Sequence, residues 1–198
     1  MKRVGLTGGI GSGKTTIARI LEAIGYPVFY SDQQAKSLMT NPEVQQQINS
    51  ILEQNVFPDG ELDRAVMADL IFKNVEKREA VNAYLHPKVR EAFQDWANQQ
   101  NSTLVFNEAA ILFETGAYKL MDVNVLVLAP QKLRISRTMK RDQVSEGAVL
   151  ERISKQADDE TKIPMADFII YNDDVQPVLT QVEGLIEQLS SSLRHSGL

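Results

Sequence analysis

The sequence GGIGSGKT at residues 8–15 has the composition and spacing of a loop that binds phosphate. It matches the pattern G-x-x-x-x-G-K-[ST], with Gly8, Gly13, Lys14 and Thr15 at the fixed positions. Glycines let successive backbone N–H groups curve around a phosphate, and a helix that follows adds N–H donors and a favourable dipole. A strand-like segment precedes the motif and a helical segment follows it, which favours a phosphate site over a glycine-rich turn with a surface lysine.

Each side chain of this loop has an expected role with a nucleoside triphosphate. Lys14 is expected to bring its charge to the β- and γ-phosphates, Thr15 to bind Mg²⁺ through its hydroxyl, and Thr16 to contact the α-phosphate. The residues of the loop that we expect to bind ATP are Gly8, Gly11, Ser12, Gly13, Lys14, Thr15 and Thr16. The motif by itself does not distinguish a kinase from an ATPase or a GTPase.

Two acids stand where strand-like segments end. Asp32 follows the segment 26–31, and Glu108 is the last residue of the segment 103–108. Ligands of open α/β sheets lie outside the carboxyl ends of the strands, so both acids are expected near the phosphate loop. Asp32 either accepts a proton from a substrate hydroxyl or caps the next helix. Glu108 either holds Mg²⁺, directly or through water, or is a solvated acid at a strand end.

Three arginines follow one another at helical spacing in the segment LRISRTMKRD, residues 133–142. Arg134, Arg137 and Arg141 are separated by three and four residues, which places them on one face of a helix. A solvated helix face is one interpretation. Together with the phosphate loop, a lid that closes over ATP is the better one, because arginine pairs with phosphate and phosphoryl transfer requires exclusion of water.

The elements that must position these residues alternate between strands and helices. Five short apolar segments, at 3–7, 26–31, 103–108, 123–129 and 167–172, are typical of strands buried in a parallel sheet. The sequence therefore predicts an α/β fold with three parts. These are a core formed by 1–31, 103–129 and 164–198, a mostly helical lobe at 32–102, and a charged helical lid at 130–163.

Two local signals refine the helical lobe. Asn41 and Pro42 predict the start of a helix, with the asparagine as its N-cap. Pro87 is expected to begin a new helix or to kink the existing one, because it lacks the N–H of a helix interior.

The composition limits the kinds of partner. The 198 residues carry a formal net charge of −5, which argues against a broad nucleic-acid surface. The chain has no cysteine, so disulfides, thiolate catalysis and zinc–thiolate sites are excluded. No segment resembles a signal peptide or approaches the roughly 20 apolar residues of a membrane span, so we expect a cytoplasmic protein without membrane partners.

An ordered series of motifs resembles the dephospho-CoA kinase family almost from end to end. VGLTGGIGSGKTTIA resembles the family's opening, YSDQQAK its D-x-D-x-x-A segment, and YLHP its L-H-P motif. NEAAILFE, RTMKRD and QADDETKIPMADFIIYND resemble three further segments, the last with Gln156, Lys162, Asp167 and Asn172. Tyr30 stands in place of the first acid of D-x-D, which leaves Asp32 to act alone.

The resemblance implies a P-loop kinase fold with three layers, a five-stranded parallel sheet, a helical acceptor insertion and a helical lid. It implies that ATP, with Mg²⁺ as cofactor, phosphorylates the ribose 3′-hydroxyl of dephospho-CoA. The implied catalytic residues are Lys14, Asp32 and Arg141, and the implied acceptor-binding residues are Asp32, His86 and Glu114. Arg137 and Asn172 join the ATP site, the latter near the adenine, and Thr15 and Glu108 are the implied metal-binding residues.

Two other hypotheses remain open from the sequence. A kinase of the same fold for another small hydroxyl or a nucleoside monophosphate would use the loop in the same way. A nucleotide-gated binding protein would use it without an acceptor, although no N-K-x-D guanine motif is present. The oligomeric state is not determined by the sequence.

Overall fold

The computed structural model describes residues 1–195, which form two compact units. The sheet unit consists of Met1–Phe29 and the chain from Gln100 onward, and the helical unit is Tyr30–Gln99. For comparison, the sequence places the helical lobe at 32–102. The expected core segment 164–198 ends with three residues that lie outside the described part.

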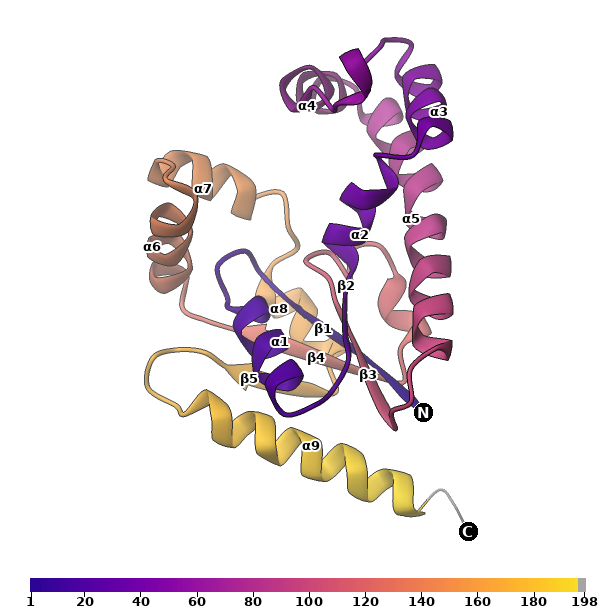
Figure 1. The fold of residues 1–198 in the computed structure, drawn as a ribbon. Coiled ribbons are helices and arrows are strands. Elements are labelled where there is room, and N and C mark those ends of the chain that lie inside the picture. Colours follow the sequence, from indigo (N-terminus) through magenta and orange to yellow (C-terminus); the bar gives the residue numbers. More distant parts are fainter. Residues whose placement is uncertain (196–198) are drawn as a thin grey trace. The chain divides into compact units, whose positions relative to one another are not determined.

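The sheet contains five strands in the order β2-β3-β1-β4-β5 (Figure 1). They are β1 (Lys2–Gly8), β2 (Val28–Tyr30), β3 (Leu104–Glu108), β4 (Val123–Leu128) and β5 (Phe168–Tyr171). β1 pairs in parallel with β3 and β4, and β4 pairs in parallel with β5. All five predicted strands are present, and the predicted α/β class with a parallel sheet is confirmed.

The strands consist mostly of apolar residues because both faces of the sheet are covered. Every residue of β3 is buried, and so are the last five residues of β1. Helix α1 (Lys14–Ala23) packs against β1 and β3, and α9 (Val178–His195) packs against α1 and β5. On the other face, a Cβ on Gly5 would collide with Leu112 and touch Met121, so the chain after β3 lies directly on the sheet there.

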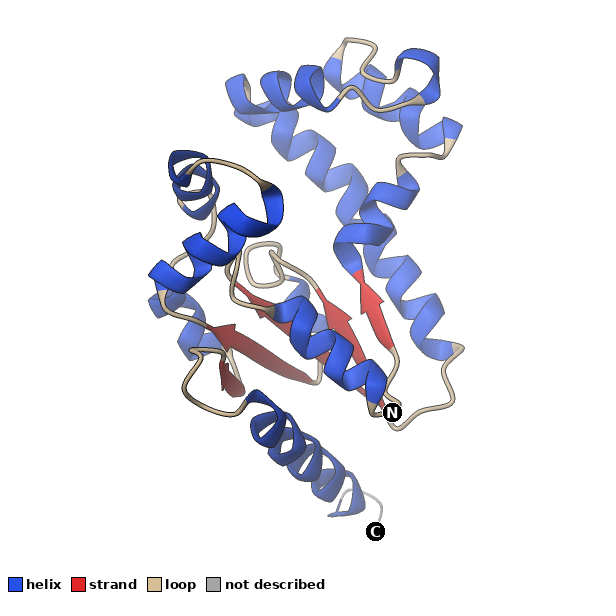
Figure 2. Cartoon of the chain, turned by 60° about the vertical axis from the view of Figure 1, so that its left-hand side comes forward, coloured by secondary structure: helices blue, strands red, loops and turns tan. Residues whose placement is uncertain are grey.

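The register of the sheet places the carboxyl ends of the strands side by side. Gly5 is level with Asn107 and Leu6 with Glu108, while Gly8 is level with Val127. Because the strands are parallel, the loop after β1 and the segments after β3, β4 and β5 all leave from the same edge. Figure 2 shows these loops at the arrowheads of the strands.

The sheet unit carries further helices and short turns in the chain after β3 and after β4. They are α6 (Gln131–Asp142), α7 (Glu146–Ile153) and α8 (Asp159–Lys162), with 3₁₀ turns η2 (Ala117–Leu120) and η3 (Ile163–Met165). α7 begins after Ser145, whose hydroxyl accepts a hydrogen bond from the N–H of Ala148. None of the helices in residues 1–195 is long and apolar enough to cross a membrane.

The helical unit is arranged around one long helix, α5 (Val75–Asn98). Helices α2 (Ser31–Leu38), α3 (Pro42–Leu52) and α4 (Arg64–Lys73) each pack against it, and η1 (Pro58–Gly60) joins α3 to α4. Its core contains Val44, Ile48, Leu52, Val56, Phe57, Met67, Val81 and Leu85. The Asn41 cap is confirmed, since its Oδ1 accepts a hydrogen bond from the N–H of Glu43 and Pro42 is the first helical residue.

Pro87 does not begin a new helix, which corrects one interpretation of the sequence. α5 is assigned as a single helix of 24 residues with Pro87 inside it. Val81 and Leu85 are buried before the proline, and Phe93 and Ala97 are buried after it. Burial of this continuous apolar face on both sides of the proline outweighs the loss of one backbone hydrogen bond.

Candidate functional site

The phosphate-binding loop connects β1 to α1 at the carboxyl edge of the sheet. Gly11 and Gly13 adopt positive φ angles of 76° and 97°, which side chains other than glycine rarely allow. Gly13 is the N-cap residue of α1 and has no side chain to cap the first turn. The turn therefore has the geometry in which a helix N-terminus is offered to an anion.

The polar side chains of the loop differ in how far they are buried. Lys14 is 8% exposed, and its Nζ donates to the carbonyl of Gly8 at 2.9 Å. Thr15 and Thr16 are exposed in the first turn of α1. Ser12 Oγ is buried and has no hydrogen-bond partner among residues 1–195.

Asn172 follows β5 and fastens the other end of the loop. Its Nδ2 donates to the carbonyl of Ser12 at 2.9 Å, and a Cβ on Gly13 would collide with the same amide group. The guanidinium of Arg137 donates to the carbonyl of Asn172 at 3.0 Å and also pairs with Asp174. The predicted ATP-binding residues Asn172 and Arg137 thus lie in one network with the loop.

The three arginines of α6 have three different environments, although they share one face of the helix. Arg134 is 7% exposed and contacts the loop itself. Arg137 is only partly exposed, and Arg141 is mostly exposed. A uniformly solvated face, one of the two interpretations of the spacing, is therefore wrong for Arg134.

Arg141 is held by a carboxylate next to it in sequence. Its Nε and one terminal nitrogen donate to the two oxygens of Asp142 at 2.7 and 3.1 Å, and Arg152 donates to Asp142 at 2.7 Å. The hydrogen bond from Arg141 is the main reason why the pKa of Asp142 falls to about 2, and the Arg152 charge and hydrogen bond add to it. The same hydrogen bond raises the pKa of Arg141. The pair orients a guanidinium that stays charged.

Glu108 is buried at the last position of β3, with 6% of its surface exposed. The alternative of a solvated acid at a strand end is therefore wrong. Residues 1–195 contain no cluster of three acidic or histidine side chains that could hold a metal ion by themselves. One carboxylate and the exposed Thr15 hydroxyl are hard oxygen ligands, a set that suits Mg²⁺ bound jointly with phosphate oxygens.

Glu114 forms an ion pair with a buried lysine beyond the end of β3. Lys162, which is 1% exposed, places its Nζ 3.2 Å from Glu114 Oε1. The same oxygen accepts a hydrogen bond from the N–H of Ala157 at 3.2 Å. These contacts hold α8 and the segment before it against the segment after β3, and the predicted role of Glu114 in acceptor binding remains a prediction.

Two predicted residues belong to the helical unit. Asp32 is exposed in the first turn of α2, and Tyr30 is the N-cap residue, so the alternative of Asp32 as the cap is wrong. His86 is half-buried on α5, and burial, together with the charge of Arg90, lowers its pKa, so the imidazole is neutral at pH 7.

A cavity of about 590 Å³ lies one helical turn beyond Asp32 along α2. Lys36, four residues after Asp32, lines it together with the apolar side chains of Met39 and Leu62 and the guanidinium-bearing Arg64. The lining of this cavity thus combines two basic side chains and one acidic side chain, Glu61, with apolar surface.

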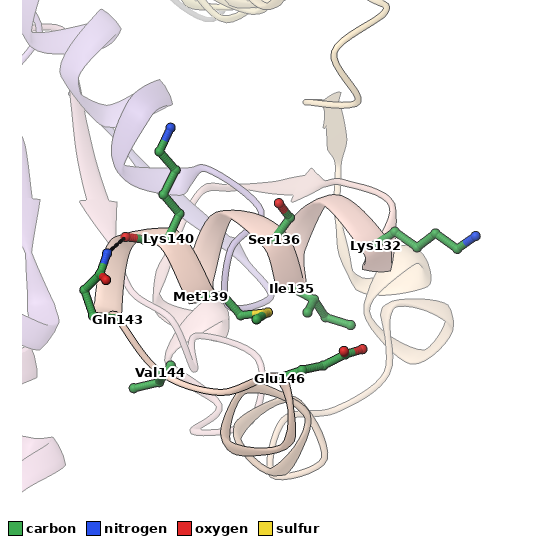
Figure 3. Close-up of a pocket in the computed structure, with 8 residues that line it drawn as sticks. All are labelled: Lys132, Ile135, Ser136, Met139, Lys140, Gln143, Val144 and Glu146. Atoms are coloured by element: carbon green, nitrogen blue, oxygen red, sulfur yellow. Dashed lines mark hydrogen bonds between the residues drawn. The ribbon is translucent and has the colours of Figure 1, made fainter.

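The opposite face of α6 lines a different cavity, of about 630 Å³, shared with the start of α7 (Figure 3). Its lining includes Lys132, Ile135, Met139, Lys140, Val144 and Glu146. None of the predicted site residues lines it. The two faces of α6 are therefore distinct, with the arginines on one and this cavity on the other.

Several contacts of the loop had no signal in the spacing of the sequence. Gln156 and Arg134 bind the backbone of Ile10 from 146 and 124 residues away. Gln156 belongs to a motif that resembles the known family, but nothing in the sequence pairs it with Ile10. The sequence likewise gives no signal that Lys162 forms an ion pair with Glu114.

Comparison with known proteins identifies strong relatives. The family model described as dephospho-CoA kinase matches residues 2–177. A dephospho-CoA kinase from Bacteroides fragilis is 34% identical over 195 residues, covering 98% of this chain and 95% of that protein. A Thermus thermophilus protein of known structure has a TM-score of 0.84 and 32% identity, with 97% of each chain covered. The dephospho-CoA kinase from Campylobacter jejuni has a TM-score of 0.69 and 26% identity, with 96% of this chain and 98% of that one covered.

Proposed function

The chain belongs to the dephospho-CoA kinase family, and we infer that it transfers the γ-phosphoryl group of ATP to the ribose 3′-hydroxyl of dephospho-CoA, the last step of coenzyme A biosynthesis. The observation that carries this inference is the loop of residues 8–15 between a buried parallel strand and a helix. Membership of the family indicates that dephospho-CoA is the phosphoryl acceptor, and the loop indicates that a nucleoside triphosphate is the phosphoryl donor.

We propose that Lys14 is the first catalytic residue. Its ammonium donates to the carbonyls of Gly8 and Gly9. These hydrogen bonds are exchanged for β- and γ-phosphate oxygens when ATP binds, so the charge of Lys14 is already in the loop. Little side-chain entropy is then lost on binding, because the buried Lys14 is ordered beforehand.

The lid arginines and Asp32 complete the proposed set. Arg141 and Arg137 stabilise the charge that spreads over the transferring phosphoryl group, for which guanidinium is well suited. Asp32 accepts the proton of the acceptor hydroxyl or orients that hydroxyl for attack. Asn172 binds near the adenine, and His86 and Glu114 contribute to acceptor binding.

Mg²⁺ is the proposed cofactor, and Thr15 and Glu108 are the residues that would hold it, the latter directly or through water. When bound, Mg²⁺ neutralises charge on the β- and γ-phosphates. The buried Glu108 carboxylate and the exposed Thr15 hydroxyl support this assignment. The cytoplasmic location expected from the sequence stays a prediction.

The decisive test measures ATP consumption with dephospho-CoA and identifies the product by mass. We expect one phosphate to be added to the acceptor, and Asp32→Asn to lower kcat by about 100-fold or more while ATP affinity changes less than threefold. Asp59→Asn, in η1 of the same unit, is the matched control and should leave kcat unchanged. Phosphorylation of a nucleoside monophosphate, with none of dephospho-CoA, would overturn the assignment of the acceptor.

A further inference from the structure

Ile10 is held at both of its backbone polar groups by side chains from outside the phosphate loop. Its N–H donates to Gln156 Oε1 at 2.8 Å, and its carbonyl accepts from Arg134 Nε at 3.0 Å. Ile10 lies in the middle of GGIGSGKT, between Gly9 and Gly11. A loop rich in glycine has many alternative conformations, so fixing its middle residue at two points removes much of that freedom.

The carboxamide of Gln156 can take only one orientation. A backbone N–H can only donate and a carbonyl can only accept, so Oε1 must face Ile10 and Nε2 must face the carbonyl of Ala110, 3.4 Å away. Ala110 follows Glu108 by two residues. Gln156 therefore joins the phosphate loop to the segment that carries the predicted metal-binding acid.

The guanidinium of Arg134 is committed in the same way. Besides Ile10, it donates to Asp159 Oδ2 at 2.9 Å in an ion pair in which its side chain is 8% exposed. A Cβ on Gly9 would collide with this guanidinium, and one on Gly11 would collide with the carbonyl of Arg134. Like Arg137 and Arg141 it is paired with a carboxylate, but its side chain is far less exposed than theirs.

We propose that Gln156 and Arg134 are positioning residues of the phosphate-binding loop, which hold Ile10 so that the loop is already curved before the triphosphate arrives. The proposal rests on the proposed function, because the triphosphate of ATP is the ligand that the loop receives. Neither side chain needs to touch the nucleotide. Their effect is to lower the cost of ordering the loop, which would otherwise reduce ATP affinity.

The test compares ATP binding in Gln156→Leu and in a matched control, by calorimetry on the full chain without acceptor. Gln45 is the control because it is also half-buried, and its Nε2 also fastens backbone, donating to the carbonyls of Met39 and Gly60 in the helical unit. We expect Gln156→Leu to weaken ATP binding about tenfold, the equivalent of one to two lost hydrogen bonds. Gln45→Leu should lower thermal stability with ATP affinity unchanged.

A second readout reports on the loop directly. Amide hydrogen exchange of the peptide that contains Ile10 should accelerate in Gln156→Leu and not in Gln45→Leu. Arg134→Lys keeps the charge but cannot reach both Ile10 and Asp159, so its loss of ATP affinity should be smaller than that of Arg134→Met. Because both side chains act on one residue, Gln156→Leu and Arg134→Lys should be non-additive.

An ATP dissociation constant for Gln156→Leu within twofold of the wild type would overturn the proposal, as would an equal change in Gln45→Leu. If Gln156→Leu does not fold, Arg134→Lys decides by the same criterion. Because ATP binding is measured without acceptor, the outcome is separate from the identity of the acceptor. A wild type that binds ATP but does not phosphorylate dephospho-CoA would overturn the proposed function and leave this inference intact.

Discussion

Replacement of Lys162 by methionine tests how much the buried ion pair with Glu114 contributes to the sheet unit. The lysine side chain is 1% exposed, and its Nζ lies 3.2 Å from Glu114 Oε1. Methionine fills nearly the same space without charge. The variant therefore removes one partner of the pair and leaves the Glu114 carboxylate, whose side chain is 21% exposed, without its counter-charge.

The expected loss follows from what Glu114 retains. Removal of one partner of a fully buried pair costs about 3–5 kcal/mol. Glu114 keeps the hydrogen bond from Ala157 and is 21% exposed, so we expect the lower end, about 3 kcal/mol. For a chain of this size each 1 kcal/mol lowers Tm by about 2–4 °C, so Tm should fall by roughly 6–12 °C.

The assay is reversible denaturation of four proteins: wild type, Lys162→Met, Glu114→Gln and the double variant. The double variant should recover most of the loss, because it leaves no uncompensated charge. Lys73→Met breaks an exposed pair with Asp69 and is the control, with an expected cost of at most about 0.5 kcal/mol. A loss below about 1 kcal/mol in Lys162→Met would refute the argument that this pair is energetically coupled.

The same variants separate the structural contacts of Glu114 from its predicted role with the acceptor. If Glu114 also binds dephospho-CoA, Glu114→Gln should raise the KM for the acceptor more than Lys162→Met does, at equal ATP affinity. Equal KM changes in the two variants would assign Glu114 to holding the segment before α8.

Three further predictions concern the loop, the helical unit and the lid. Gly13→Ala should lower the free energy of unfolding by about 2 kcal/mol or more, because it places a Cβ at φ 97° and against the Asn172 amide. Gly147→Ala in α7, where a Cβ meets nothing within 4 Å, should raise the free energy of unfolding by about 0.5–1 kcal/mol. Because the pKa of His86 is lowered in the folded state, the unfolded chain binds more protons below about pH 6.5. The free energy of unfolding should therefore fall as the pH drops through the folded pKa. His86→Gln should lose this part of the pH dependence in denaturation curves measured between about pH 7.5 and 5. Asp142→Asn should lower kcat about threefold at unchanged ATP affinity, because Arg141 loses the carboxylate that orients it; a rise in kcat in steady-state assays would contradict this.

The features that the sequence predicted well are local ones. The phosphate-binding loop is recognised from eight consecutive residues, 8–15, and buried parallel strands are recognised as short apolar runs. The cap at Asn41 is another local signal that the structure confirms. Pro87 shows the limit of this approach, because the burial that keeps α5 continuous comes from tertiary packing.

The spacing of the arginines on α6 correctly predicted a shared face but not what each one does. Arg134 is buried by the loop and Asp159, Arg137 is drawn to the chain after β5, and Arg141 is paired with its neighbour Asp142. Periodicity fixes the direction of a side chain relative to its own helix only. The partner that meets it is set by the topology of the sheet, which no short window contains.

The glycines of the phosphate loop are required by residues that are distant in sequence as well as by the phosphate. Phosphate binding explains why backbone N–H groups must be accessible, but packing within the protein also requires a missing side chain at three positions. Gly9 faces the Arg134 guanidinium, Gly11 the backbone of α6 and Gly13 the Asn172 amide. A Cβ at any of them would disturb the fold before ATP binds, so the loop is shaped by its neighbours as much as by its ligand.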